Sequence, residues 1–76
     1  MSKMLQIRYC QENDRLTWGD WDIHCGDILD VMLPDQSGGA EWRTASFEHS
    51  DLKGGWYMPA LPGVSPIGLW ARENKD

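Results

Sequence analysis

The chain has 76 residues, which is enough for one small domain with a modest core. It has only two cysteines, no signal-peptide pattern and no apolar run near 18 residues, so we expect a cytoplasmic protein that does not span a membrane. The net charge is −5, and residues 12–35 carry −6 against +1 for the remainder, which disfavours direct nucleic-acid binding and favours a basic protein partner.

The first part of the chain is predicted to form a β-hairpin. Met4 to Tyr9 alternates loosely between apolar and polar residues, and the polar cluster at 11–14 is typical of a turn. Leu16 to Trp18 is a second β-prone run. A further turn at Gly19-Asp20 leads into a short strand over residues 21–24.

The next predicted strand is Ile28 to Leu33, which follows a turn at Gly26-Asp27. Its alternation places three aliphatic side chains on one face and two on the other, namely Leu29, Val31 and Leu33 against Ile28 and Met32. This pattern is typical of a strand that is buried on one side and partly buried on the other.

Residues 34–39 are predicted to form a loop, because proline ends the strand and the glycines permit left-handed turns. A long strand is then expected over residues 41–49. Ala45 and Phe47 suit its core-facing side, whereas the sequence leaves the facing of Trp42 open.

The last part of the chain is predicted to contain two short strands, at 56–58 and 67–71. The stretch 59–66 between them is too rich in proline for a central strand. The charged tail from Arg72, and residues 73–76 in particular, is expected to be disordered.

No segment has the apolar spacing of an amphipathic helix, so the fold class is predicted to be all-β. Five or six short strands linked by glycine-containing turns favour a small SH3-like barrel over residues 1–76 as a single domain. An OB-like barrel and an open antiparallel meander are the alternatives.

The chain has five tryptophans, which are expected to supply much of the buried apolar area of so small a domain. They are Trp18, Trp21, Trp42, Trp56 and Trp70. One interpretation is that they complete the core of the barrel and plug its ends. The other is that those that do not fit inside form an exposed aromatic surface.

Four motifs occur in a characteristic order: Ile23-His24-Cys25-Gly26-Asp27, Trp42-Arg43-Thr44 with Phe47-Glu48, Gly55-Trp56-Tyr57, and Gly68-Leu69-Trp70-Ala71-Arg72. In this order, over residues 14–72, the chain resembles a family of short bacterial proteins built around an uncharacterised domain, often encoded in Firmicutes and on mobile elements. The chain departs from the family pattern in having Ile23 in place of leucine, a different spacing after Trp42 and a longer loop at 59–66. The resemblance implies a small β-barrel and supplies no catalytic residues.

His24 and Cys25 are adjacent, a combination that raises the question of thiol chemistry. A cysteine nucleophile needs a base within hydrogen-bonding distance, and neighbouring strand residues point to opposite faces, so His24 is a poor base for Cys25. His49 could approach them across strands, but no pattern requires it. We expect Cys25 to pack as a small hydrophobe and His24 to bond to backbone or a nearby acid.

Four residues are of types that zinc binds: Cys10, His24, Cys25 and His49. A Cys/His metal-binding protein is therefore one alternative, although the spacing lacks the close pairs of a zinc knuckle. A disulfide between the two cysteines is disfavoured by the expected cytoplasmic location. A chain this small rarely builds a cleft for paired carboxylates, so we predict no enzyme activity and no cofactor.

The predicted functional surface combines aromatic and acidic side chains: Trp18, Asp20, Trp21, Asp22, Asp27, Trp56 and Tyr57. Tryptophan and tyrosine are favoured at protein interfaces, and surrounding carboxylates select a partner with a basic surface. We thus predict a non-enzymatic protein-binding module, monomeric or weakly homodimeric through an uncovered edge strand. The alternative is an acidic phage or mobile-element inhibitor that mimics nucleic-acid charge.

Overall fold

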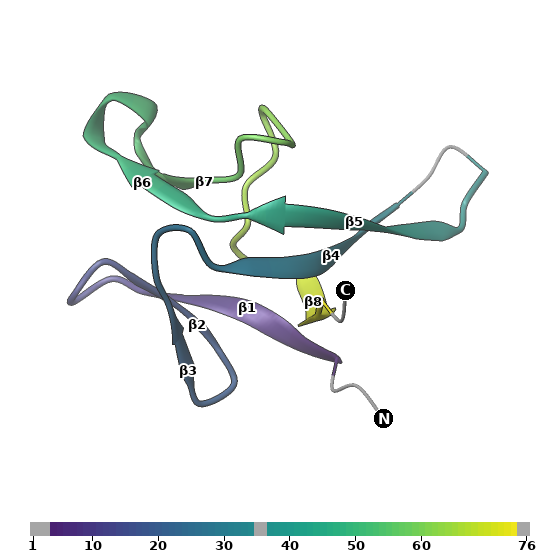
Figure 1. The fold of residues 1–76 in the computed structure, drawn as a ribbon, viewed down its shortest axis with the longest axis horizontal. Coiled ribbons are helices and arrows are strands. Elements are labelled where there is room, and N and C mark those ends of the chain that lie inside the picture. The colour runs from purple at the N-terminus through teal and green to yellow at the C-terminus, as the bar shows by residue number, and fades with distance from the viewer. Residues whose placement is uncertain (1–3, 35–36, 75–76) are drawn as a thin grey trace.

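The computed structural model describes residues 4–34 and 37–74, and these residues form strands, turns and one short 3-10 segment (Figure 1). The elements in chain order are β1 (Met4–Cys10), β2 (Arg15–Trp18), β3 (Trp21–Ile23), β4 (Ile28–Pro34), β5 (Ala40–Ser46), β6 (Glu48–Ser50), η1 (Asp51–Lys53), β7 (Gly55–Tyr57) and β8 (Trp70–Glu73). The predicted all-β class is confirmed. Over the described residues, no helix has the length and apolar character needed to cross a membrane.

The strands form two antiparallel sheets. The main sheet has six strands in the order β3-β2-β1-β8-β4-β5, and β6 pairs with β7 in a second, two-stranded sheet. The last strand, β8, lies between β1 and β4 and so joins the N-terminal meander to the β4–β5 hairpin. The result is a compact, barrel-like fold that is not closed, because β3 and β5 remain the two edges of the main sheet (Figure 1).

The predicted N-terminal hairpin is confirmed, with Ile7 opposite Trp18 and Tyr9 opposite Leu16. The turn from β2 to β3 depends on Gly19, which has a φ of 62°. A Cβ atom on this residue would lie 2.8 Å from Cδ1 of Leu5. The left-handed backbone therefore favours glycine here, and a larger side chain would also have to displace the end of the Leu5 side chain.

The second half of the chain differs from the prediction in two places. The strand expected over 41–49 is interrupted at Phe47 and forms β5 and β6. The strand expected over 67–71 begins only at Trp70, because Gly68 has a φ of 89° and turns the chain.

The prediction of a disordered tail from residue 73 is wrong for Glu73, which lies in β8 opposite Leu29. The backbone ladder holds this residue, and Nδ2 of Asn74 donates to Oδ1 of Asp30 at 2.9 Å. Residues 75–76 lie outside the described part of the chain.

The core lies between the inner face of the main sheet and the segment that follows β7. It consists of Ile7, Leu16, Trp18, Ile23, Leu29, Val31, Ala45, Phe47, Met58, Leu61 and Ala71. The predicted inward facing of Leu29, Val31, Ala45 and Phe47 is confirmed. The five tryptophans divide between the two interpretations: Trp18 is buried in the core and the partly buried Trp56 packs against it, whereas Trp21 and Trp70 are exposed. Aliphatic side chains fill most of the interior.

Candidate functional site

The structure divides the predicted aromatic and acidic surface into separate places. Asp20, Trp21 and Asp22 lie at the turn and strand that follow β2, whereas Trp56 and Tyr57 lie in β7. These two groups belong to different sheets. No strand pairing connects the two groups, so the predicted surface is not one continuous site.

Trp18 is a core residue, so it offers little surface to a partner, although it contributes to the wall of a hollow. Its side chain is 7% exposed, and its Nε1 donates to the carbonyl oxygen of Ala71 at 3.0 Å. Trp21 packs edge-on against it, with 5.9 Å between the ring centroids. Trp18 therefore links β2 to β8 and supports the more exposed Trp21.

The corner between β2 and β3 carries a shallow hollow of about 380 Å³, lined by Leu5, Trp18, Gly19, Asp20 and Trp21. Trp21 is 40% exposed, and Asp20 is exposed beside it. Oδ2 of Asp22 pairs with Nη1 of Arg15 at 3.3 Å on the same hairpin. This corner thus keeps one aromatic ring and one carboxylate in contact with solvent.

Asp27 has a structural role in the turn before β4. Its Oδ2 accepts a hydrogen bond from the backbone N–H of His24 at 2.7 Å, and it lies 3.7 Å from Nδ1 of that histidine. Its backbone oxygen accepts from the N–H of Phe47. Asp27 is half-buried and its carboxylate holds the turn, so less of this side chain is available for contact with a partner.

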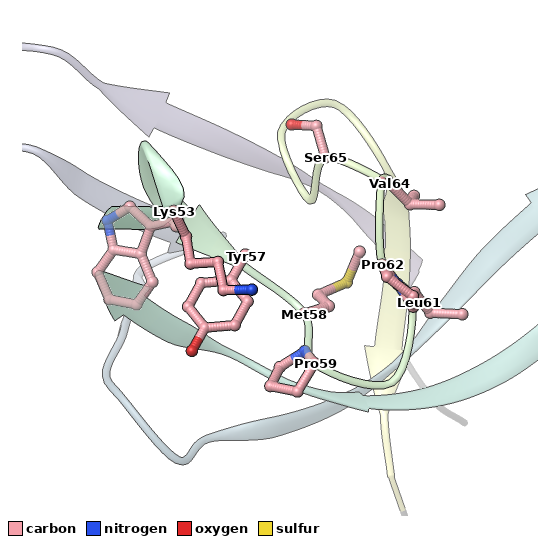
Figure 2. A pocket seen from close by; sticks show the side chains of 10 residues that line it. Lys53, Tyr57, Met58, Pro59, Leu61, Pro62, Val64 and Ser65 are labelled. Carbon is pink, nitrogen blue, oxygen red and sulfur yellow. The ribbon is translucent and has the colours of Figure 1, made fainter. Parts of the chain in front are cut away.

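A groove of about 570 Å³ lies between β7 and the loop over residues 58–65 (Figure 2). Its lining is mostly aromatic, aliphatic and proline side chains: Lys53, Trp56, Tyr57, Met58, Pro59, Leu61, Pro62, Gly63, Val64 and Ser65. We call it the β7 groove. Nζ of Lys53 lies 5.8 Å from the centroid of the Tyr57 ring. The two side chains are labelled in Figure 2.

The β7 groove contains two of the predicted binding residues, Trp56 and Tyr57, together with residues that sequence reasoning missed. Most of the missed residues lie in the stretch 59–66, whose prolines predict only that it is not a central strand; Lys53 lies in η1, and Met58 is the last residue of the strand expected at 56–58. Leu61 and Met58 are buried and anchor this loop to the core, which leaves Pro59 and Pro62 on its exposed side. The repeated prolines were the sequence signal for a stiff loop, but they did not indicate where it packs.

A second cluster centres on Asp14, in the turn between β1 and β2. Its Oδ1 accepts a hydrogen bond from the hydroxyl of Tyr9 at 2.7 Å, and its Oδ2 lies 2.6 Å from Nε2 of His49. Its backbone oxygen accepts from Nε1 of Trp56 at 3.0 Å. We call these four residues the Asp14 cluster. It ties the first hairpin to β6 and β7 and fixes Trp56 at the end of the β7 groove.

The Asp14 cluster is expected to make folding stability sensitive to pH. The hydrogen bond from Tyr9, followed by that from His49, lowers the pKa of the Asp14 carboxyl below its ordinary value. A lowered folded-state pKa gives stability that is present above the unfolded-state pKa of about 4 and is lost as the pH falls through the folded-state value. The same bond to Asp14 raises the pKa of Tyr9, so the Tyr9 contribution is lost at strongly alkaline pH instead.

The variant Asp14→Asn tests this, because asparagine tolerates the left-handed φ of 52° at this position. We expect the wild type to lose more stability than the variant between about pH 7 and about pH 3, measured as urea midpoints by circular dichroism. Asp30, whose pKa is lowered chiefly by the hydrogen bond from Asn74, contributes equally in both proteins. Equal losses in the two proteins would contradict the role assigned to Asp14.

None of the cysteine and histidine residues lines the β7 groove, although the ring of His49 packs against that of Trp56 at 5.2 Å between centroids. Cys10 and Cys25 are exposed and free, so the expectation that Cys25 packs as a small hydrophobe is wrong. His24 is exposed, whereas His49 belongs to the Asp14 cluster. Within residues 4–34 and 37–74, no three His, Cys, Asp or Glu side chains lie close enough together to hold a metal ion.

Comparison with models of known protein families identifies the family of this chain. The model of a domain of unknown function, DUF5348, matches residues 3–72. Searches of curated proteins and of solved structures returned no match. The matched range includes all four motifs on which the resemblance to an uncharacterised family of short proteins was based, and that resemblance is confirmed. Because the match covers almost the whole chain, the protein is a member of the DUF5348 family.

Proposed function

We propose that the protein is a non-enzymatic binding module that holds a short, extended segment of a partner protein in the β7 groove. The observation that carries this proposal is the gathering of aromatic and proline side chains around one open groove in a domain with so small a core. The volume of about 570 Å³ lies within the range of ordinary ligand sites. The proposed setting is the reducing cytoplasm, in keeping with the exposed, free thiols of Cys10 and Cys25.

The lining of the β7 groove favours an apolar peptide segment. Trp56 and Tyr57 are half-buried, so each ring is held by its surroundings and still has surface for contact. Pro59 and Pro62 add rigid rings to the lining. Rigid rings lose little conformational entropy when a partner binds, which is why aromatic residues dominate binding energy at protein interfaces.

The charge of the chain favours lysine or arginine beside the apolar part of the segment. The protein carries −5 overall, and two carboxylates lie in the elements that adjoin the groove. Glu48 in β6 is directly opposite Tyr57 in β7, and Asp51 is exposed in η1. The one cation of the lining, Lys53, already lies over the ring of Tyr57. Opposite charge of this kind mainly accelerates association with a basic partner.

The alternative of an inhibitor that mimics nucleic-acid charge receives less support. Such a mimic needs a row of unpaired carboxylates, and four aspartates of the acidic segment bond to groups of the chain itself. They are Asp14 with Tyr9 and His49, Asp22 with Arg15, Asp27 with the backbone of His24, and Asp30 with Thr44 and Asn74. These bonds occupy the carboxylate oxygens and fix the side chains in place, so we base the proposal on the β7 groove.

Selection from a random peptide display library tests the proposal. We expect enriched peptides to combine apolar residues with lysine or arginine, and to shift the amide NMR signals of residues 53–65 most strongly. Tyr57→Ala is expected to weaken binding of a selected peptide by about tenfold or more, because it removes a ring of the groove wall. Affinity is measured by titration calorimetry, with circular dichroism to check the fold.

Trp70→Ala provides the matched control, because Trp70 is an exposed aromatic residue outside the groove lining. Its affinity for the same peptide is expected to equal that of the wild type. Enrichment of no peptide, or signal shifts centred away from the groove in the wild-type protein, would refute the proposed site whether or not Tyr57→Ala folds.

A further inference from the structure

The strand β5 has a free backbone edge. It pairs with β4 along its whole length, from Ala40 opposite Pro34 to Ser46 opposite Ile28. In the order of the main sheet it is the last strand, and within residues 4–34 and 37–74 no strand pairs with its other side. With seven residues it is more than twice as long as β3, the opposite edge. A long open edge can accept another strand.

The hydrogen bonds of Phe47, the residue that follows β5, show in which direction the backbone groups of β5 point. The N–H of Phe47 donates to the oxygen of Asp27, and the oxygen of Phe47 accepts from the N–H of Gly26, so both groups of Phe47 point toward the β4 side. Backbone groups alternate in direction along a strand. Those of Glu41 and Arg43 therefore also point toward β4, and those of Trp42 point outward.

The side chains along this edge carry one negative and one positive charge. Glu41 and Arg43 lie on the same face of the sheet and about half of each side chain is exposed, with Nη1 of Arg43 at 3.4 Å from Oε1 of Glu41. Trp42 between them lies on the other face, where Arg72 stacks on its ring at 4.0 Å. The two charged residues of this edge thus lie one position before and one position after Trp42.

We propose that two copies of the chain associate through this edge, as an antiparallel β5–β5 pair with Trp42 on the two-fold axis. In that register the outward backbone groups of Ala40, Trp42 and Thr44 meet their counterparts. Glu41 lies directly opposite Arg43 of the second copy, and Arg43 lies opposite its Glu41. A symmetric pair of this kind is the simplest closed assembly of identical chains.

The charges of Glu41 and Arg43 favour this register over the two neighbouring registers. The adjacent registers that keep the outward backbone groups paired are displaced by two residues. One of them places Glu41 against Glu41 of the second copy, and the other places Arg43 against Arg43. Like charges directly opposite one another destabilise a strand pair, whereas opposite charges stabilise it. The contact is short, so the dimer is weak and depends on protein concentration.

Sedimentation velocity over a concentration series tests this with purified protein. The wild type is expected to shift from its monomer mass of 8.7 kDa toward twice that mass as concentration rises. Glu41→Arg and Arg43→Glu each place like charges opposite one another in the dimer, and each is expected to weaken association about tenfold or more. The double variant Glu41→Arg/Arg43→Glu restores the opposite charges and is expected to dimerise like the wild type.

Mixing the Glu41→Arg and Arg43→Glu variants gives a further test. In a mixed dimer the two arginines of one variant lie opposite the two glutamates of the other, so this dimer is expected to form. Glu12→Arg is the control: it changes the net charge equally at an exposed turn away from β5. A wild type that remains monomeric at every concentration would overturn the proposal. A dimer that forms equally in Glu41→Arg would place the contact elsewhere and would also overturn it.

Discussion

Replacing Phe47 with alanine is expected to lower the free energy of unfolding by about 3–5 kcal/mol. Phe47 is fully buried, and among the fully buried side chains of the described residues it is the largest. It lies where β5 gives way to β6, and its backbone holds the turn before β4 through Gly26 and Asp27. A domain of this size has a total stability of only about 4–11 kcal/mol, so the variant loses a large part of it. Urea denaturation followed by circular dichroism measures the loss.

Leu52→Ala is the control for this prediction. Leu52 is also a large apolar residue, but its side chain is 99% exposed in η1. Its replacement is expected to change stability by less than about 0.5 kcal/mol. If Phe47→Ala were no more destabilising than Leu52→Ala, the position of the core would be wrong.

Replacing Trp18 with phenylalanine is expected to cost about 1–3 kcal/mol, although the new residue is also aromatic and apolar. The substitution removes the indole N–H that donates to the oxygen of Ala71, and it leaves that buried acceptor without its side-chain donor. It also reduces the surface on which Trp21 packs edge-on. Thermal and urea unfolding measure the cost.

Trp70→Phe is the matched substitution at an exposed tryptophan of β8. Its effect is expected to be less than about 0.5 kcal/mol. Equal losses for Trp18→Phe and Trp70→Phe would mean that the buried hydrogen bond contributes nothing to stability.

Local patterns were sufficient to predict most of the strands. The alternation in β4 fixed the inward facing of Leu29 and Val31, and Ala45 and Phe47 were correctly assigned to the core. Glycine-containing turns marked the ends of β2 and the start of β4. These features depend on interactions within a few residues, which the sequence displays directly.

The candidate site was less predictable because it depends on contacts between distant segments. Whether a tryptophan is buried is decided by its neighbours in the sheet: Trp18 meets Ala71, 53 positions away, whereas Trp21 lies on an edge strand. Asp14 resembled any turn residue, and only the fold brings it to Trp56, 42 positions away. For the same reason the loop wall of the β7 groove was missed.

The position of β8 has a consequence for how the protein acquires its shape during synthesis. The strands β1 and β4 each pair with β8, and no direct pairing joins them in the main sheet. On the ribosome the first three strands and the β4–β5 hairpin can emerge early, but they have no shared partner until residues 70–73 have left the exit tunnel. Assembly must therefore wait for a late segment, and contacts of this long sequence separation slow folding. Until residues 70–73 are available, the N-terminal meander and the β4–β5 hairpin remain unjoined in the main sheet.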